Sequence, residues 1–309
     1  MHSHETPGSL WLTEYNNPYD AVCHGILEVV HQQKTRFQEM MIVRSGATGK
    51  ALVLDGCWQS CTGDEFMYHE ALVHPPCLLQ GGPKKVLILG GGEGAALREA
   101  LKWKTVTEAV MVDLDGAVVD ACRRHLPEMH QGAFDDPRSR VVIADALAYV
   151  DAVPGNWDVI VSDLTDPLEH GPSAKLFTRE YFAQCRRALA PGGCFVIQAG
   201  LAGPVEMQLH VRLANTVASV FQRMWHWLVP VPSWGSPMGF VCGADDTVGW
   251  EDPEPEAVDE RLAGLIDGPL RMFDGRTMRA LMHPPKYLRD AIAAENHVYS
   301  LAALPRAIR

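Results

Sequence analysis

The hydrophobic pattern of the first 80 residues is typical of short β-strands. Segments rich in Val, Ile, Leu and Met are separated by glycine-containing turns, and they cover residues 22–30, 37–44 and 51–54. A helix is then expected from Asp64 to Leu79. The pair Pro75 and Pro76 is expected to kink it or end it early, because proline has no backbone N–H. The pattern therefore predicts a β-rich part over residues 1–80.

From Lys84 onward, apolar runs alternate with amphipathic segments. The runs predict strands at 86–89, 109–115, 141–146, 158–163 and 194–200. The periodic segments predict helices at 95–103, 118–126, 175–189 and 206–223. The runs 225–231 and 238–242 are expected to close the sheet as an antiparallel pair, and the acidic, proline-rich stretch 251–260 reads as a surface loop before C-terminal helices. This alternation predicts an α/β fold with a Rossmann-like, seven-stranded sheet over residues 81–309.

The composition excludes several classes of partner. The chain has 309 residues and a formal net charge of −11. An acidic protein repels nucleic acid and anionic lipid, so we expect neither as a partner, whereas a cationic small molecule is attracted. Without a long apolar run or a signal-peptide pattern, we expect no membrane span and a cytoplasmic location. The eight cysteines show no CxxC spacing and no HExxH motif occurs, so we expect no metal.

Acidic residues follow four successive predicted strands. The run VLILGGGEGAAL places Glu93 inside a glycine turn, and Asp113, Asp145 and Asp163 end the next three strands. The turn glycines are Gly90, Gly91 and Gly92. In a parallel sheet these strand ends converge at the edge where ligands bind. Unpaired acids crowded on one rim repel each other, which favours a binding role over a purely structural one.

The charge of Glu93 narrows the choice of ligand. Asp113, about 20 residues after the turn, suits the ribose of NAD and of an S-adenosyl nucleoside equally. NAD would bring a pyrophosphate to Glu93, whereas an adenosyl sulfonium brings a positive charge. Decarboxylated S-adenosylmethionine has a purely cationic tail, so a rim of acids with no Arg or Lys nearby suits it best. Two unit charges 4 Å apart interact by about 4 kcal/mol at an effective dielectric constant of 20.

Two polar stretches supply candidates for the chemistry. SDLTDP puts Asp163 and Asp166 on one loop after a strand, although an Asp-Pro pair is also an ordinary turn. DGCWQSCTGDEFMYHE contributes Gln59, Tyr68 and His69, although part of this stretch is expected to cap and pack a helix. We expect His69 to be a structural hydrogen-bond partner rather than a base.

An ordered series of motifs resembles the polyamine aminopropyltransferases, the family of spermidine, spermine and thermospermine synthases. The series comprises FQEMMIVRS, LVLDGxxQS, DEFMYHE, KKVLILGGGEGAxxRE, LPEMHQGAFDDPR, DVIVSDLTDP, GPSAKLFTxxYF and ALAPGGCFVIQAG, over about residues 15–245. The resemblance implies a small N-terminal β domain, involved in oligomerisation and in the acceptor site, joined to a class I methyltransferase-type Rossmann domain. It implies aminopropyl transfer from decarboxylated S-adenosylmethionine to a polyamine, with methylthioadenosine as the second product. It also implies no cofactor and a homodimer or homotetramer.

The resemblance assigns roles residue by residue. For the donor, it places Gln38 and Glu93, with the glycine turn, at the nucleoside, Asp113 at the ribose hydroxyls and Asp145 at the adenine.

For the chemistry, the resemblance makes Asp163 the base and the contact of the donor's ammonium. Asp166 and Tyr68 are implied to lie beside the attacking amine. The resemblance also implies that Gln59 and Gln198 line the channel, and we further expect His69 and Trp234 among the substrate-binding residues.

Two departures from the family pattern concern the acceptor. The loop DPLEHGPSAKLF inserts residues after the Asp-Pro pair, and VPSWG carries Trp234 where many relatives have a tyrosine. Both features look more like thermospermine synthases, which accept spermidine. An indole still holds an alkylammonium by cation–π contact. Putrescine therefore stays open as an acceptor, and it is the default because it is the commonest acceptor in the family that the chain resembles; thermospermine synthesis is the alternative. An S-adenosylmethionine-dependent N-methyltransferase and a non-catalytic polyamine sensor are the rivals outside the family.

Overall fold

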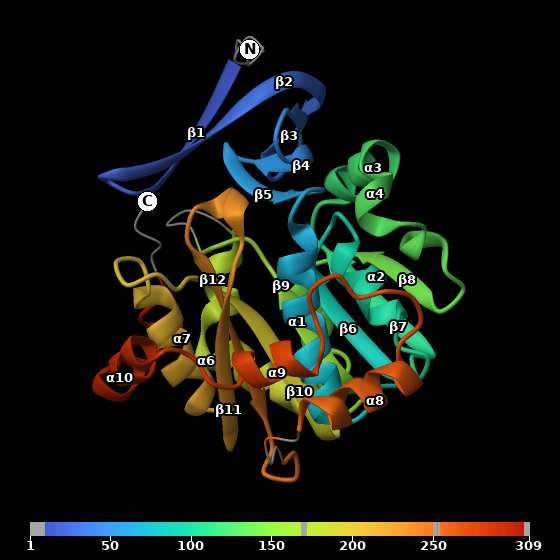
Figure 1. Cartoon of the computed structure of the whole chain (residues 1–309), viewed down its shortest axis with the longest axis vertical. Coiled ribbons are helices and arrows are strands. Elements are labelled where there is room, and N and C mark those ends of the chain that lie inside the picture. Colours follow the sequence, from blue (N-terminus) through green and yellow to red (C-terminus); the bar gives the residue numbers. More distant parts are fainter. Residues whose placement is uncertain (1–9, 168–171, 250–251, 253, 306–309) are drawn as a thin grey trace.

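A computed structural model describes residues 10–167, 172–249, 252 and 254–305, and within them the chain builds two β-sheets (Figure 1). The first is antiparallel, and each of its five strands pairs with the next one in sequence. Its strands are β1 (Leu10–Asn17), β2 (Asp20–Lys34), β3 (Glu39–Ser45), β4 (Gly49–Leu54) and β5 (Cys57–Cys61). The side chain of Asn17 closes the first turn by accepting from the N–H groups of Tyr19 and Asp20. The β-rich prediction for this part is confirmed.

The second sheet has seven strands in the order β11-β12-β10-β9-β6-β7-β8. They are β6 (Lys85–Gly90), β7 (Glu108–Asp113), β8 (Ser139–Ile143), β9 (Trp157–Asp163), β10 (Leu189–Leu201), β11 (Arg223–Pro230) and β12 (Pro237–Ala244). The five strands from β10 to β8 run parallel, and β12 and β11 add to β10 in antiparallel fashion. The predicted fold class, including the antiparallel closing pair, is confirmed.

Helices cover both faces of the large sheet, because its central strands are apolar on both sides. On β6, Val86 and Ile88 face one hydrophobic cluster, while Leu87 and Leu89 face another. The first face is covered by α1 (Glu65–Gln80), α2 (Ala95–Leu101), α8 (Pro255–Leu265) and α9 (Gly275–Leu281). The second is covered by α5 (Ala146–Asp151), α6 (Arg179–Ala188) and α7 (Gln208–Ala218), and α10 (Lys286–Ala294) packs on α7.

The helix α1 continues through its two prolines, so the expected early end is wrong. Pro75 leaves the carbonyl of Ala71 without its usual i+4 donor. The indole N–H of Trp227, on β11, donates to that carbonyl at 3.1 Å. A partner from another strand therefore replaces the missing helical hydrogen bond, and local sequence carries no sign of it.

Three further boundaries differ from prediction. The stretch 251–260 is not all loop, because α8 begins at Pro255, whose fixed φ suits the first position of a helix, with Glu256 favourable in the first turn. The helix expected at 175–189 begins at Arg179, after a 3-10 turn (Pro172–Phe177), and the hydroxyl of Thr178 caps it. The helix expected at 206–223 is the shorter α7.

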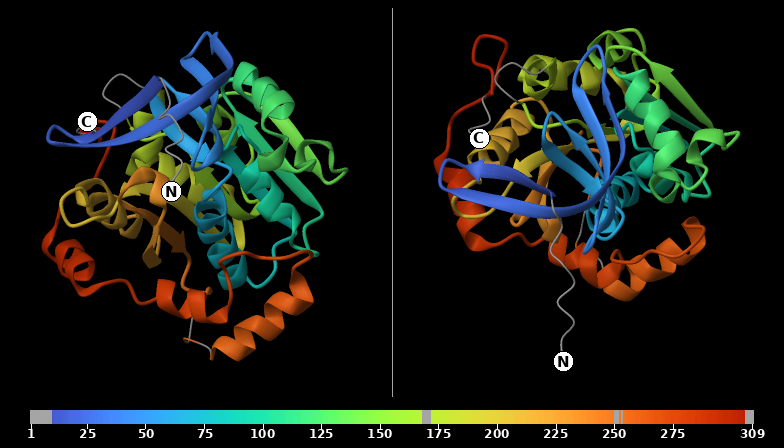
Figure 2. Two further views of the ribbon diagram at one scale, coloured as in Figure 1. Left: turned by 45° about the horizontal axis from the view of Figure 1, so that its top comes forward. Right: turned by 90° about the horizontal axis from the view of Figure 1, so that it is seen from above.

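The five-stranded sheet lies over one end of the larger sheet (Figure 2). The helices α3 (Gly116–His125) and α4 (Pro127–His130) pack beside it, and α3 contacts both β2 and β3. Although α1 falls within the predicted N-terminal part, it packs against β9 and β10 of the larger sheet. The predicted division at residue 80 stays a prediction. No described helix combines the length and the apolar character that crossing a bilayer requires.

Candidate active site

A cavity of about 530 Å³ lies between the N-terminal sheet and the carboxyl ends of the parallel strands. The four acids that were predicted to converge, Glu93, Asp113, Asp145 and Asp163, all line it. Gly90, Gly91 and Gly92 line it as well, as do Gln38, Gln59, Tyr68, Asp166, Gln198 and Trp234. The sequence-based residues therefore surround one cavity, with His69 as the exception.

Glycine is required where the turn after β6 meets the end of β9. Gly90 and Gly91 have φ values of 84° and 71°, and the N–H of Gly91 donates to the carbonyl of Asp163 at 2.9 Å. A Cβ on Gly90 would lie 2.1 Å from that carbonyl oxygen, and one on Gly91 would lie 2.9 Å from Asp163 Oδ2. The glycines thus let two strand ends approach closely and keep the Asp163 carboxylate at the cavity wall.

One carboxylate oxygen of Asp163 is hydrogen-bonded, and the other is buried without a hydrogen bond from the described residues. Tyr68, from α1, donates its hydroxyl to Asp163 Oδ1 at 2.6 Å. Oδ2 has no hydrogen-bond partner among the described residues. Burial, with the charge of Glu93 adding to it, raises the pKa of Asp163 to about 6. Burial and the neighbouring acids raise the pKa of Tyr68 well above its usual value, so the phenol stays a donor. The arrangement leaves a carboxylate of raised pKa at the cavity wall, with one oxygen bound by Tyr68 and the other buried without a hydrogen-bond partner among the described residues.

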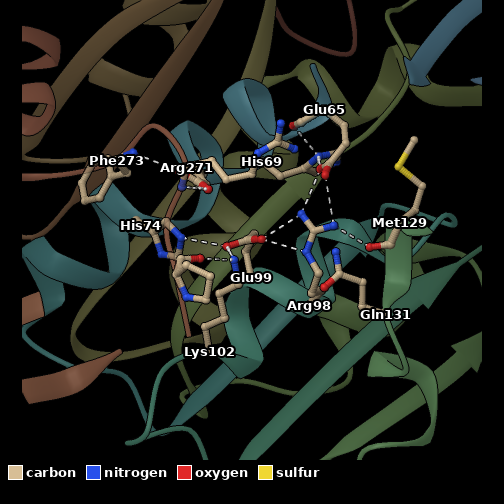
Figure 3. A network of polar contacts seen from close by, with 12 residues as sticks. Glu65, His69, His74, Arg98, Glu99, Lys102, Met129, Gln131, Arg271 and Phe273 are labelled. Carbon is tan, nitrogen blue, oxygen red and sulfur yellow. Dashed lines mark hydrogen bonds and ion pairs between the residues drawn. The ribbon is translucent and has the colours of Figure 1, made fainter. Parts of the chain in front are cut away.

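Glu93 is held by a buried counterion. His69 Nε2 lies 3.4 Å from Glu93 Oε1, and His69 Nδ1 lies 2.8 Å from Glu65 Oε2 (Figure 3). Burial alone would lower the pKa of His69, but the hydrogen bond to Glu65 and the charges of Glu65 and Glu93 raise it to about 10. The imidazolium in turn lowers the pKa of Glu93 against the effect of burial. His69 does not line the cavity. It lies behind Glu93 and not at the substrate, where its predicted role would put it.

The charge of His69 belongs to a longer network. Arg98 makes a bidentate pair with Glu65, at 3.1 and 2.9 Å, and its Nε donates to Glu99 at 2.8 Å. Glu99 also accepts from His74 and pairs with Lys102, both at 2.9 Å (Figure 3). Its members alternate in sign from Glu93 at the cavity to Lys102 near the surface, so buried charges are compensated by neighbours.

Asp113 and its neighbour Asp115 join the cavity to the N-terminal sheet. The N–H of Asp115 donates to Asp113 Oδ1 at 2.8 Å. Asp115 Oδ2 accepts from the hydroxyl of Thr35 at 2.6 Å and from Gln38 Nε2 at 3.1 Å. Burial and the charge of Asp115 raise the pKa of Asp113 to about 6. Sequence reasoning missed Asp115. The signal was its position just after the strand end and directly before a glycine, which is typical of a helix cap. Asp115 does cap α3, because it accepts from the N–H of Ala117.

Asp145 has a second task besides lining the cavity. Its Oδ1 accepts from the N–H groups of Leu147 and Ala148, at 2.7 and 3.3 Å, and so caps α5. Oδ1 of Asp145 is therefore engaged by its own helix. The predicted contact with adenine is left to Oδ2 and to the neighbouring backbone.

The opposite wall is built from rigidly held polar groups. Gln198 Nε2 donates to Leu164 O and to Asp166 Oδ1, at 2.8 and 3.1 Å, so it orients Asp166. The indole N–H of Trp234 donates to Trp58 O at 3.0 Å, and its ring meets Tyr68 edge-on, with centroids 5.3 Å apart. The Trp234 ring is therefore fixed as an aromatic surface beside the catalytic candidates.

The expectation that no Arg or Lys lies near the acids is wrong. Lys175, on the 3-10 turn after the inserted loop, lines the cavity. The acids still prevail, because nine of the described lining residues are Asp or Glu and Lys175 is the one Lys or Arg among them. Sequence reasoning also missed Glu14 and Glu206, since nothing local places β1 or the turn after β10 at this cavity. Residues 168–171 of the inserted loop lie outside the described residues.

Comparison with known proteins agrees with this geometry. Residues 65–248 match the spermine/spermidine synthase domain, and residues 10–61 match the spermidine synthase tetramerisation domain. A polyamine aminopropyltransferase of Synechococcus sp. (strain JA-3-3Ab) is 52% identical over 97% of this chain and 99% of the relative. One of Aeropyrum pernix is 46% identical over 94% and 93%.

Solved structures give the same family. A spermidine synthase in complex with the transition-state analogue AdoDATO matches with a TM-score of 0.86 and 29% identity, over 94% of this chain and 97% of that one. The spermidine synthase from Thermotoga maritima matches with a TM-score of 0.84 and 29% identity, over 94% and 96%. The chain belongs to the spermine/spermidine synthase family. It is accordingly an enzyme of the aminopropyltransferase class.

Proposed function

We propose that the chain transfers the aminopropyl group of decarboxylated S-adenosylmethionine to putrescine, giving spermidine and methylthioadenosine. The observation that carries the proposal is the Asp163 carboxylate, with Oδ1 held by Tyr68 and Oδ2 without a partner among the described residues, on a cavity lined by acids. The family membership supports the same class of reaction.

Charge favours the decarboxylated donor. The sulfonium and the primary ammonium of this nucleoside are both cationic, and Glu93, Asp113 and Asp163 supply the negative side of the pairing. In the proposed complex, Asp113 and Gln38, which donates to Asp115, bind the ribose side of the nucleoside, and Asp145 with the backbone next to it binds the adenine. The carboxylate of intact S-adenosylmethionine would meet these acids with repulsion.

The chemical step needs a base. A primary amine has a pKa of about 10, so the acceptor arrives protonated and cannot attack. In the proposed step Asp163 takes a proton from the attacking nitrogen, the nitrogen lone pair forms a bond to the propyl carbon next to sulfur, and the C–S electrons return to sulfur as a neutral thioether. Positioned proton transfer of this kind is worth about 10²–10⁴ in rate. Asp166, oriented by Gln198, and Tyr68 are placed to guide the amine.

Observations at Trp234 and Glu206 support an alternative identity for the acceptor. Trp234 has its N–H engaged by Trp58, so it offers an acceptor its ring rather than a hydrogen bond. Glu206, another of the acids that line the cavity, accepts from the hydroxyl of Ser236 at 3.2 Å. An additional carboxylate suits an acceptor with more than two amines, and spermidine, giving thermospermine, is therefore the alternative to putrescine.

The reaction as proposed needs no cofactor and no metal, since it moves one proton and breaks one C–S bond. Within the described part of the chain, His, Cys, Asp and Glu form no group of three or more that could hold a metal ion.

We also propose assembly into a dimer or tetramer through the N-terminal sheet. Exposed apolar side chains on it support this, among them Leu10, Trp11, Tyr15 and Leu27. Light scattering that gives a monomer mass would contradict the assembly.

The test is a product assay read by mass spectrometry. Wild-type protein is incubated with the decarboxylated donor and with putrescine, cadaverine or spermidine in separate reactions, with Asp163→Asn as the matched control. We expect spermidine from putrescine, and a loss of about 10²–10⁴ in turnover for a normally folded Asp163→Asn. Thermospermine from spermidine alone would select the alternative. In a parallel reaction with S-adenosylmethionine as donor, methylated products would replace the proposal by the methyltransferase, and binding without turnover of either donor would replace it by the sensor.

A further inference from the structure

The C-terminal segment reaches the active-site cavity from outside the family domain. The match to the spermine/spermidine synthase domain ends at residue 248. Beyond it, Tyr299 is the one described residue that lines the cavity, and its side chain is buried at 4% exposure. In Figure 1 the chain after α10 runs beside α7 toward the end of the large sheet over which the N-terminal sheet lies.

The position of Tyr299 is fixed by its backbone. Its N–H donates to the hydroxyl of Thr216, on α7, at 3.0 Å, and its carbonyl accepts from the N–H of Arg179, at the start of α6, also at 3.0 Å. Two residues later, the N–H of Leu301 donates to Glu180 at 3.1 Å. These contacts bind the segment to α6 and to α7, whose residue Leu209 lines the cavity, so Tyr299 is held at a fixed place in the cavity wall.

An anchor further upstream holds the same segment to α7. Arg212 donates to the carboxylate of Glu295 at 3.0 Å, and Asn215 donates to the carbonyl of Glu295 at 2.8 Å. With Thr216, these residues lie on one face of α7, because positions three and four apart are neighbours on a helix. The helix that carries Leu209 to the cavity is thus braced along its length by the C-terminal segment.

Two apolar walls of the cavity belong to the two faces of the large sheet. Tyr68, Leu201, Trp234 and Met238 belong to or pack on the cluster of the α1 face. The other wall is part of the cluster on the opposite face and comprises Ala146, Leu147, Leu164, Leu176, Leu209 and Tyr299. This second wall includes the residues that follow Asp145. It therefore lies on the side where the proposed function puts the adenine, while Tyr68 and Trp234 lie on the side of the acceptor.

We infer that Tyr299 is a specificity residue of the donor pocket: its ring contacts the adenine of the bound nucleoside, so the C-terminal segment completes a site that the family domain alone leaves open. An aromatic ring is suited to this place, because a purine presents a flat apolar face and stacking on an aromatic side chain is tolerant of small shifts. The inference rests on the proposed function, since it takes the donor to be an adenosyl nucleoside.

Calorimetry with methylthioadenosine tests the inference on the full chain. We expect Tyr299→Ala to weaken binding by about tenfold, at the lower part of the range for loss of an aromatic contact to a base. Tyr299→Phe is expected to stay within about twofold of wild type, because the ring and not the hydroxyl is used. Tyr287→Ala is the matched control: Tyr287 is a second tyrosine of the C-terminal region, it bonds Ala202 O and does not line the cavity. It is expected to leave the affinity within about twofold.

The outcomes separate the inference from the proposed function. Wild-type protein that fails to bind methylthioadenosine overturns the proposed function. Wild-type protein that binds it, with Tyr299→Ala folded and binding equally well, overturns the inference alone, as does a rise confined to the acceptor KM. If Tyr299→Ala does not fold, an azidoadenosine photoprobe is applied to wild-type protein. Labelling of the tryptic peptide that contains Tyr299, suppressed by excess methylthioadenosine, is expected, and labelling confined to other peptides contradicts the inference.

Discussion

The buried pair of His69 and Glu93 allows a quantitative test of how the cavity keeps its negative charge. The side chains are 1% and 11% exposed and their charged atoms lie 3.4 Å apart. At an effective dielectric constant of 20, two unit charges at that separation attract by about 5 kcal/mol. Desolvation opposes this gain, but removing one partner leaves the other charge buried and alone, which typically costs about 3–5 kcal/mol.

A double-mutant cycle measures the pair. His69→Gln is expected to lower the free energy of unfolding by about 3 kcal/mol, because Glu93 loses its counterion while Glu65 keeps Arg98. In the Glu93→Gln background the same change should cost much less, giving a coupling energy of about 2–3 kcal/mol. Urea unfolding at neutral pH supplies the four free energies. Single changes that add to within about 0.5 kcal/mol would refute the claim that the two charges hold each other.

Three further outcomes follow from the contacts. In pH–rate profiles, Tyr68→Phe should move the acid limb of kcat/KM to higher pH. Burial and the charge of Glu93 raise the pKa of Asp163 to about 6, and the hydrogen bond from Tyr68 opposes that rise, so its loss should raise this pKa further. An unmoved limb contradicts this. Glu70→Ala should cost at least about 3 kcal/mol in urea unfolding, since the carboxylate accepts from three successive backbone N–H groups near α9; a change below about 1 kcal/mol would disprove that role. Burial lowers the pKa values of His210 and His226 to about 3 and about 4. Their contribution to stability is therefore complete above about pH 6.5 and is lost as the pH falls from there toward the pKa values of the folded state. Replacing both by Asn should flatten the pH dependence of the free energy of unfolding in that window.

Much of the fold could be predicted because its signals are local. Short apolar runs followed by amphipathic segments define a parallel sheet, and once the strands are parallel their carboxyl ends must share an edge. From that rule alone, the sequence predicts that Glu93, Asp113, Asp145 and Asp163 converge, and all four line one cavity. The helix that runs through Pro75 is the opposite case, since it depends on the indole of Trp227, which is distant in sequence.

The parts of the site that could not be predicted depend on how separate elements dock. His69 was expected at the substrate, but the packing of α1 on α2, β9 and β10 places it behind Glu93, where it acts through that carboxylate. Lys175 was missed because a residue after an inserted loop gives no sign of which way it faces. Tyr299 was missed for a similar reason: its side chain reaches the cavity only because the C-terminal segment folds back on α6 and α7.

The central claim is that an acid-lined cavity selects a doubly cationic sulfonium nucleoside. Isothermal titration of the wild-type protein with decarboxylated S-adenosylmethionine and with S-adenosylmethionine, at the same pH and low salt, tests it most directly. We expect the decarboxylated nucleoside to bind at least about tenfold more tightly. This corresponds to about 1.4 kcal/mol, well within the repulsion between the nine lining carboxylates and the additional carboxylate of S-adenosylmethionine. Equal affinities, or tighter binding of S-adenosylmethionine, would contradict it.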